Sequence, residues 1–297
     1  MFSDAASQEQ TFRLFPGMEH SMRQSVSTVV IEPAGKVPDL GLAELREYSE
    51  LFFFLIWRDI KGRYAQSVLG IGWAIVQPVM AMIVFTVIFG NLAEIASDGV
   101  PYSIFSFTGL VAWTYYSNAL TDSTGSLVIN ANMLQKIYFP RLILPLSAVL
   151  ARMVDFTISL AILVIMMLWY GIAPTWWALG LPVLVLVLII SAAGMGMFLG
   201  AMAVQYRDVK HAMSFGIRLL MYAAPVVYPL SYVPEQYRLL YAVNPMVGVV
   251  EGFRASLLGT GPMPWDLIAV SSLSGAVTFF AGAWYFRKKE HVFADVG

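Results

Sequence analysis

Long apolar stretches alternate with short polar ones along most of this chain. A helix that crosses a membrane needs about 20 mostly apolar residues. Residues 64–93, 99–121 and 156–206 contain no charged side chain, and the turn formers Gly171 and Pro174 divide the last of these stretches. The pattern predicts an all-α integral membrane protein with six transmembrane helices, at about Leu69–Asn91, Tyr102–Thr121, Leu144–Tyr170, Trp177–Val204, Ala212–Tyr228 and Leu267–Phe286.

A different pattern precedes the first predicted span. Between Leu42 and Trp57 apolar side chains recur at three- and four-residue steps, and glutamates occupy the other faces. The apolar stripe consists of Leu42, Leu45, Tyr48, Phe52 and Leu55. We expect an amphipathic helix that lies in the membrane interface. A helix packed on a soluble partner is the alternative.

The segment 235–259, between the fifth and sixth predicted spans, is neither long nor apolar enough to cross the membrane comfortably. Pro234 and the pair Asn244-Pro245 divide it into two short helices, which we place at the outer face, dipping into the membrane. Glu251 and Arg254 lie three residues apart and therefore share one helical face.

Composition and charge support a membrane environment and set its orientation. Charged residues make up 12% of the chain, against about 25% in soluble domains. Of the 18 Lys and Arg residues, all but Arg238 and Arg254 fall on or near one side of the six predicted spans. By the positive-inside rule that side, with both termini, is cytoplasmic. The polar residues 1–40 are expected to form a flexible cytoplasmic extension, and residues 41–297 the transmembrane domain.

The chain lacks the residues on which several kinds of chemistry depend. It has no cysteine and three widely separated histidines, which argues against a metal site. It has no phosphate-binding loop for ATP and no nucleophile motif, so no catalytic residue is assigned. A net charge of −1 gives no reason to expect a nucleic-acid partner. Arg152 and Asp155 lie within the third predicted span and are expected to pair with each other as a structural element.

Two cytoplasmic segments carry candidate interaction residues. Arg58, Lys61 and Arg63 follow the interface helix, where they either anchor the topology or meet a phosphorylated lipid head group. The loop 130–141 is predicted to form a short helix, capped by Asn130 and ended by Pro140. Its apolar residues either form a docking surface or pack on the bundle; they are Met133, Leu134, Ile137 and Tyr138.

Several stretches, in this order, resemble the membrane subunits of type-two ABC exporters for polysaccharides and polyol phosphates, such as O antigen, teichoic acid and capsule. The resemblance covers about residues 42–297. The stretches are Arg58 to Tyr64, Ser67 to Gly70, Trp73 to Pro78, Asn132 to Leu134 with Lys136, Phe139 to Arg141, Tyr206 to Val209, Asn244-Pro245, Glu251 to Arg254, and Phe293 to Asp295.

The resemblance implies a transmembrane exporter subunit of the bacterial inner membrane that is not itself an enzyme. Two copies would form a homodimer around a channel, with two copies of a cytoplasmic ABC ATPase below that bind ATP and Mg²⁺. The cargo would be a polysaccharide linked to a lipid carrier. A membrane-embedded glycosyl or acyl transferase and an exporter of drugs or small lipids are the alternatives; the first would transfer groups by itself, and the second would respond to small molecules.

The same resemblance implies roles for named residues. Arg58, Lys61 and Arg63 would recruit a lipid pyrophosphate. The coupling helix to the ATPase would include Asn132, Met133, Leu134, Lys136 and Tyr138. The channel would be lined by Trp73, Gln77, Met80 and Tyr222. The two short helices would be an outer gate that includes Glu235, Tyr237, Asn244, Pro245, Glu251 and Arg254.

Overall fold

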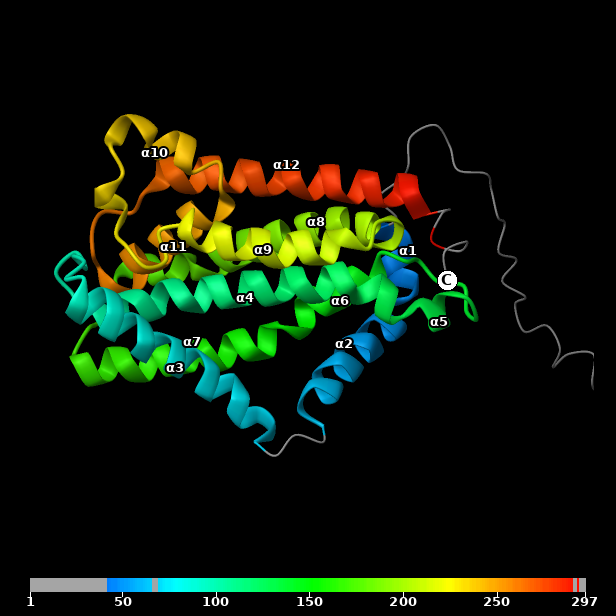
Figure 1. Ribbon diagram of the computed structural model, residues 1–297, viewed down its shortest axis with the longest axis horizontal. Coiled ribbons are helices and arrows are strands. Elements are labelled where there is room, and N and C mark those ends of the chain that lie inside the picture. Colours follow the sequence, from blue (N-terminus) through cyan, green and yellow to red (C-terminus); the bar gives the residue numbers. More distant parts are fainter. Residues whose placement is uncertain (1–41, 66–68, 291–292, 294–297) are drawn as a thin grey trace, which may run out of the picture. The chain divides into compact units, whose positions relative to one another are not determined.

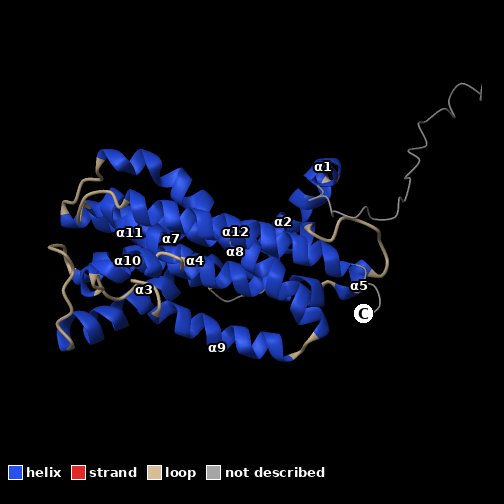
Figure 2. Ribbon diagram, turned by 90° about the horizontal axis from the view of Figure 1, so that it is seen from above, coloured by secondary structure: helices blue, strands red, loops and turns tan. Residues whose placement is uncertain are grey.

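The computed structural model describes residues 42–65, 69–290 and 293 (Figure 1). The described part is helical and contains no β-strand (Figure 2). The predicted extension at residues 1–40 lies outside it. The helices are α1 (Leu42–Glu47), α2 (Ser49–Tyr64), α3 (Trp73–Phe85), α4 (Tyr102–Ile129), α5 (Ala131–Leu134), α6 (Ile143–Ala151), α7 (Met153–Tyr170), α8 (Leu181–Gln205), α9 (Asp208–Tyr222), α10 (Glu235–Tyr241), α11 (Pro245–Phe253) and α12 (Trp265–Lys289).

Within the described residues, four helical segments are long and apolar enough to cross a membrane. They correspond to the first, third, fourth and sixth predicted spans. Their bounds are Gly70–Leu92, Ile143–Tyr170, Trp176–Gln205 and Trp265–Lys289. Short 3₁₀ segments precede α3 and α8, and a π-helical turn extends α3 to Leu92. The molecule is therefore an all-α protein with several apolar helices of membrane-spanning length.

The second and fifth predicted spans correspond to α4 and α9, which have a different character. α4 has 28 residues, but it is rich in serine and threonine. The hydroxyls of Thr108 and Thr124 donate to carbonyls one turn back, at 2.8 Å each, which lets these polar groups lie in the core. α9 has 15 residues and ends at Tyr222, earlier than the predicted Tyr228. It lies beside α8 and α4 on one face of the bundle (Figures 1 and 2).

The third predicted span is bent rather than straight. α6 ends at Ala151 and α7 begins at Met153, with a turn at Arg152 between them. The axis changes direction there (Figure 1). At this bend Arg152 contacts Asp122 of α4 and Asp155 of α7, and the charged groups described below converge at this point.

Small residues allow the central helices to approach closely. A Cβ atom on Gly282 of α12 would lie 2.1 Å from the carbonyl oxygen of Gly194 on α8. A Cβ on Gly196 would lie 2.3 Å from the hydroxyl oxygen of Ser123 on α4. Close backbone contact through small residues is a common way in which helices associate in membranes. α8 is therefore held against both α12 and α4.

The two short helices of segment 235–259 differ in their surroundings. α10 carries exposed side chains, whereas α11 and the π-helical turn Arg254–Leu258 after it are almost entirely buried. α11 packs on α12, α8 and α4. The placement of both helices at the outer face stays a prediction, but α11 is packed within the bundle. Its apolar residues and glycines fit a helix packed among others.

The interface helix is longer than predicted, and a break at Tyr48 divides it into α1 and α2. Leu55 from the predicted stripe is fully buried, and Phe52 packs against the core. α2 contacts α6, so the predicted stripe faces the protein's own bundle. A second apolar set points outward: Phe53, Phe54 and Trp57 are 68%, 61% and 60% exposed.

Candidate functional site

Four charged side chains, from α2, α4, α7 and the turn between α6 and α7, form a closed ring, which we call the charge ring. Arg63, at the end of α2, contacts Asp122 and Asp155 at 3.2 Å each. Arg152 contacts the same carboxylates at 2.6 and 3.0 Å. Each arginine therefore bridges both aspartates, and the ring carries no net charge. These side chains are 17–30% exposed and are therefore partly removed from water. Charges in such surroundings need partners of opposite charge, which the ring provides.

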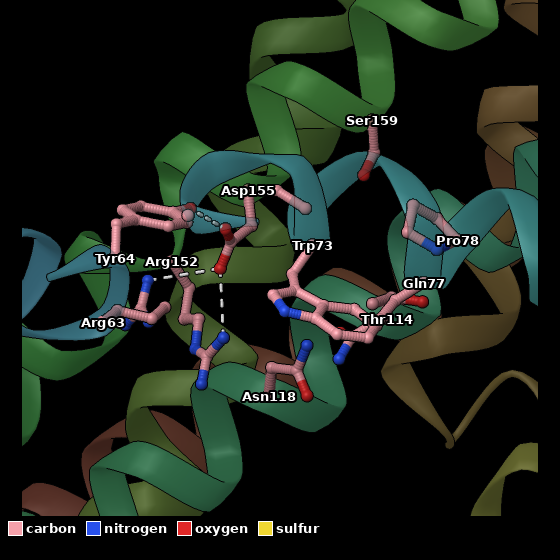
Figure 3. Close-up of a pocket in the computed structure, with 12 residues that line it drawn as sticks. Arg63, Tyr64, Trp73, Gln77, Pro78, Thr114, Asn118, Arg152, Asp155 and Ser159 are labelled. Atoms are coloured by element: carbon pink, nitrogen blue, oxygen red, sulfur yellow. Dashed lines mark hydrogen bonds and ion pairs between the residues drawn. The ribbon is translucent and has the colours of Figure 1, made fainter. Parts of the chain in front are cut away.

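The chain positions each member of the ring locally. Arg152 occupies the turn between α6 and α7, and Asp155 follows in the first turn of α7. The guanidinium of Arg63 also donates to the carbonyl oxygen of Ala151 at 3.1 Å. The hydroxyl of Tyr64 donates to the Asp155 carboxylate (Figure 3). Burial and this hydrogen bond raise the pKa of Tyr64 to about 12. The end of α2 is therefore tied to the bend at Arg152.

The predicted pairing of Arg152 with Asp155 is confirmed, but it is only one side of the ring. Asp122 was missed. The sequence did offer one indication of its role: Asp122 is a single acidic residue that directly follows the uncharged stretch 99–121. The sequence does not show that Asp122 and Arg152 lie at the same level of the bundle, because this depends on how α4 packs against α6 and α7.

A cavity of about 380 Å³ opens on one side of the ring; we call it the indole cavity. Its charged end is formed by Arg63, Arg152 and Asp155, and its other end by an indole, amides and hydroxyls (Figure 3). The residues of this second end are Trp73, Gln77, Thr114, Asn118 and Ser159. The lining is thus cationic and acidic at one end and neutral but polar at the other.

A second cavity of about 450 Å³ lies on the other side of the ring; we call it the arginine cavity. It shares Arg63 and Arg152 with the indole cavity and adds Arg58 and Asn130. The Arg58 guanidinium lies 2.8 Å from the Asp59 carboxylate. Its Nη1 also lies 4.0 Å from the sulfur of Met133 in α5. This cavity therefore connects the cationic segment with the loop that was predicted to dock an ATPase.

The three cations of the predicted lipid site have different surroundings. Arg58 is paired with Asp59, and Arg63 is a member of the charge ring. Lys61 is exposed on α2. The structure thus brings Arg58 and Arg63 to one cavity and leaves Lys61 on the surface. Lipid recruitment itself stays a prediction.

The loop 130–141 is less helical than predicted. Its helix, α5, ends at Leu134 rather than near Pro140. The side chain of Asn130 forms no capping hydrogen bond with α5, and its amide nitrogen donates to the carbonyl oxygen of Ser126 at 2.8 Å. The apolar residues divide into two pairs. Met133 and Leu134 pack on the core, whereas Ile137 and Tyr138 are 59% and 76% exposed. Of the other residues predicted for coupling, Asn132 and Lys136 are exposed.

The four residues predicted to line a channel do not converge. Trp73 and Gln77 line the indole cavity. Met80, further along α3, is 52% exposed, and Tyr222 at the end of α9 is 57% exposed. Channel lining stays a prediction for all four.

The residues predicted for the outer gate have different surroundings: some are buried and others are exposed. Arg254 is fully buried and lies 2.8 Å from Glu251. Its guanidinium donates to the carbonyl oxygens of Pro225 at 2.6 Å and Val226 at 2.8 Å. It also lies 3.6 Å from the ring centre of Phe105. Arg254 therefore holds the segment after α9 against α4 and α11.

The remaining gate residues take smaller roles. The Asn244 side chain accepts a hydrogen bond from the backbone N–H of Met246 at 3.1 Å and so caps α11, in which Pro245 is the first residue. Glu235 and Tyr237 are exposed on α10. No group of three or more metal-ligating His, Asp or Glu side chains occurs among the described residues.

Comparison with known proteins gives consistent results. The chain is 29% identical to the O-antigen export system permease protein RfbA of Myxococcus xanthus, over 85% of this chain and 97% of that one. It is 26% identical to the RfbA protein of Klebsiella pneumoniae, over 83% and 95%. It is 23% identical to the polysialic acid transport protein KpsM of Escherichia coli, over 80% and 92%.

The family profile described as ABC-2 type transporter matches residues 50–258. This range contains α3 to α11, both cavities and the charge ring. It covers well over half of the chain, and the apolar helices described above suit a multi-pass membrane protein. The chain therefore belongs to the ABC-2 type transporter family.

Proposed function

We propose that this chain is the transmembrane subunit of an ATP-driven exporter that moves a lipid-linked polysaccharide across the bacterial inner membrane. The observation that carries the proposal is its near full-length similarity to relatives named for O-antigen export and polysialic acid transport. A separate ABC ATPase subunit would bind ATP and Mg²⁺. The transferase alternative is not favoured, because these relatives are named as permeases and a transport protein.

In this proposal α4 and α9 complete six membrane passes, with both termini in the cytoplasm. α9 alone would rise about 22 Å, less than the ~30 Å hydrocarbon core. The Arg254-anchored segment after α9 would therefore lie within the membrane, covered by protein. Irregular backbone is tolerated at that depth only where protein or water covers it.

The proposal includes a second copy of the chain, and the exposed face of α9 is the observation in its favour. Polar and cationic side chains recur along it at three- and four-residue steps; they are Arg207, His211, Ser214 and Arg218, followed by Tyr222. Arg218 lies within the helix rather than at its end. Charged side chains within membrane helices face a protein interior or a water-filled path rather than lipid. A homodimer that encloses an aqueous path against α9 would meet this requirement.

The loop 130–141 supplies the contact with the ATPase in this proposal. Ile137 and Tyr138 are its most exposed apolar residues, and Met133 connects it to Arg58. A movement of the loop caused by the ATPase would thus be transmitted through this contact to α2 and the charge ring. Arg58 and Lys61 would meet the diphosphate of the lipid carrier, as arginine suits phosphate.

The test is export of polymer by vesicles that contain this chain and its ATPase. Ile137→Asp with Tyr138→Asp should abolish ATPase co-purification and export. A matched control, Leu239→Asp with Leu240→Asp, alters exposed residues of α10 and should retain the ATPase. Export that does not require the ATPase, or sugar transfer by this chain alone, would overturn the proposal.

A further inference from the structure

Two cavities with different chemistry lie on the two sides of the charge ring. Both are lined by Arg63 and Arg152, so they adjoin at this ring. The arginine cavity is lined by three arginines whose guanidinium groups suit phosphate, and by the Asp59 and Asp122 carboxylates with which they pair. The indole cavity, in contrast, has mostly neutral polar groups beyond the ring. Adjacent sites of this kind suit a ligand with an anionic part joined to a neutral polar part.

The neutral end of the indole cavity has the chemistry of a sugar site. Trp73 is 46% exposed and offers a flat apolar face. Gln77 and Asn118 supply amide groups that both donate and accept hydrogen bonds. None of the side chains at this end is hydrogen-bonded to another residue drawn in Figure 3. Their polar groups are therefore available to a ligand with several hydroxyls.

The size of the cavity is compatible with such a ligand. Its volume of about 380 Å³ is within the range of about 300–1,000 Å³ that is usual for small-molecule sites. An acyl chain would suit this lining poorly, because buried amides and hydroxyls without partners are unfavourable.

We propose that the indole cavity binds the sugar unit next to the lipid diphosphate, while the diphosphate itself occupies the arginine cavity. This inference rests on the proposed function and adds a specificity site to it. Diphosphate oxygens would compete with the aspartates for Arg63 and Arg152, and loosening of the ring would join the two cavities. Trp73 and Asn118 would then distinguish a carrier with a sugar from a carrier without one.

The test compares binding of two kinds of probe to the purified full-length chain in nanodiscs. One probe is farnesyl diphosphate, and the others are farnesyl diphosphates that carry glucose, galactose or N-acetylglucosamine. For at least one sugar we expect binding about tenfold tighter than for the bare probe, which is the effect of one or two hydrogen bonds. Trp73→Ala and Asn118→Ala should each remove most of this gain and leave binding of the bare probe unchanged.

Control variants keep a loss of folding apart from a loss of the site. Ile75→Ala changes a residue of α3 that is 45% exposed and does not line the cavity, so it should preserve the gain. Trp73→Phe retains an aromatic face and should recover most of it. Arg58→Gln, which changes a residue of the arginine cavity, should weaken binding of every probe by a similar factor.

The possible outcomes separate the two proposals. If the bare probe binds as tightly as every sugar-bearing probe, or if the gain survives Trp73→Ala and Asn118→Ala, the sugar site is wrong and diphosphate recruitment stands. If no probe binds while vesicles with the ATPase still export polymer, both sites are wrong and the exporter function stands. If export fails as well, the proposed function is wrong.

Discussion

Replacement of Arg254 by methionine should destabilise the protein strongly. Arg254 is fully buried, and its guanidinium bonds to Glu251 and to the carbonyl oxygens of Pro225 and Val226, at 2.6–2.8 Å. Methionine fills much of the space of the aliphatic stem but donates no hydrogen bond. Arg254→Met therefore leaves the Glu251 carboxylate and two carbonyl oxygens without their partner.

The size of the effect follows from these contacts. Loss of one partner of a buried ion pair costs about 3–5 kcal/mol, and each buried acceptor left unsatisfied costs about 1–3 kcal/mol. Local relaxation and water will satisfy some of these groups, so we expect a total loss of about 3–5 kcal/mol. Addition of Glu251→Gln removes the unpaired charge, and the double variant should recover about 1–2 kcal/mol of that loss.

The assay is unfolding of the purified protein in mild detergent by titration with sodium dodecyl sulfate. Arg238→Met is the matched control. Arg238 lies 3.8 Å from Glu235, whose side chain is 89% exposed, so this variant should lose less than about 1 kcal/mol. If Arg254→Met unfolds within about 1 kcal/mol of the unmodified protein, the guanidinium does not anchor the segment after α9.

Three further predictions concern helix packing and the charge ring. Gly282→Ala should cost about 1–3 kcal/mol in the same assay, because its Cβ would lie 2.1 Å from the Gly194 carbonyl oxygen; Gly216→Ala, with nothing within 4 Å, should be neutral or stabilising. Asp122→Asn should weaken the ring and speed hydrogen exchange in α2, and unchanged exchange would show that the ring does not hold α2. Tyr64→Phe should cost about 1 kcal/mol. Because the pKa of Tyr64 is raised from 10.0 to about 12, this contribution is complete below pH 10 and lost only as the pH rises through 12; a loss between pH 6 and 9 would contradict it.

Two properties of the molecule were predictable from local sequence. Four of the six predicted spans emerge from hydropathy because transfer into lipid depends on the composition of about 20 consecutive residues. The pair Arg152 and Asp155 is predictable because residues three apart share a helical face. The motifs between residues 58 and 295 indicated the exporter family, with which the similarity to named relatives agrees.

Other features depended on which helices become neighbours. Asp122 joins the ring only because α4 packs beside the bend at Arg152. The spacing of the two residues along the chain does not predict this contact. α11 is too short to be identified as a membrane helix, yet it is buried among α4, α8 and α12. Asn130 precedes α5 as predicted for a cap, but its side chain donates to the Ser126 carbonyl oxygen of α4 and accepts no hydrogen bond from α5.

The apolar stripe of α2 shows the same division. Periodicity predicted which side chains share a face, since that is a property of the helix itself. It did not predict whether that face meets lipid or protein, because both are apolar surroundings. Only the packing of α2 on α6 decided that Leu55 lies in the core and that Phe53, Phe54 and Trp57 face outward. Sequence alone thus determined four apolar spans and the family, whereas tertiary structure decided the charge ring, the two cavities and the direction in which each apolar face points.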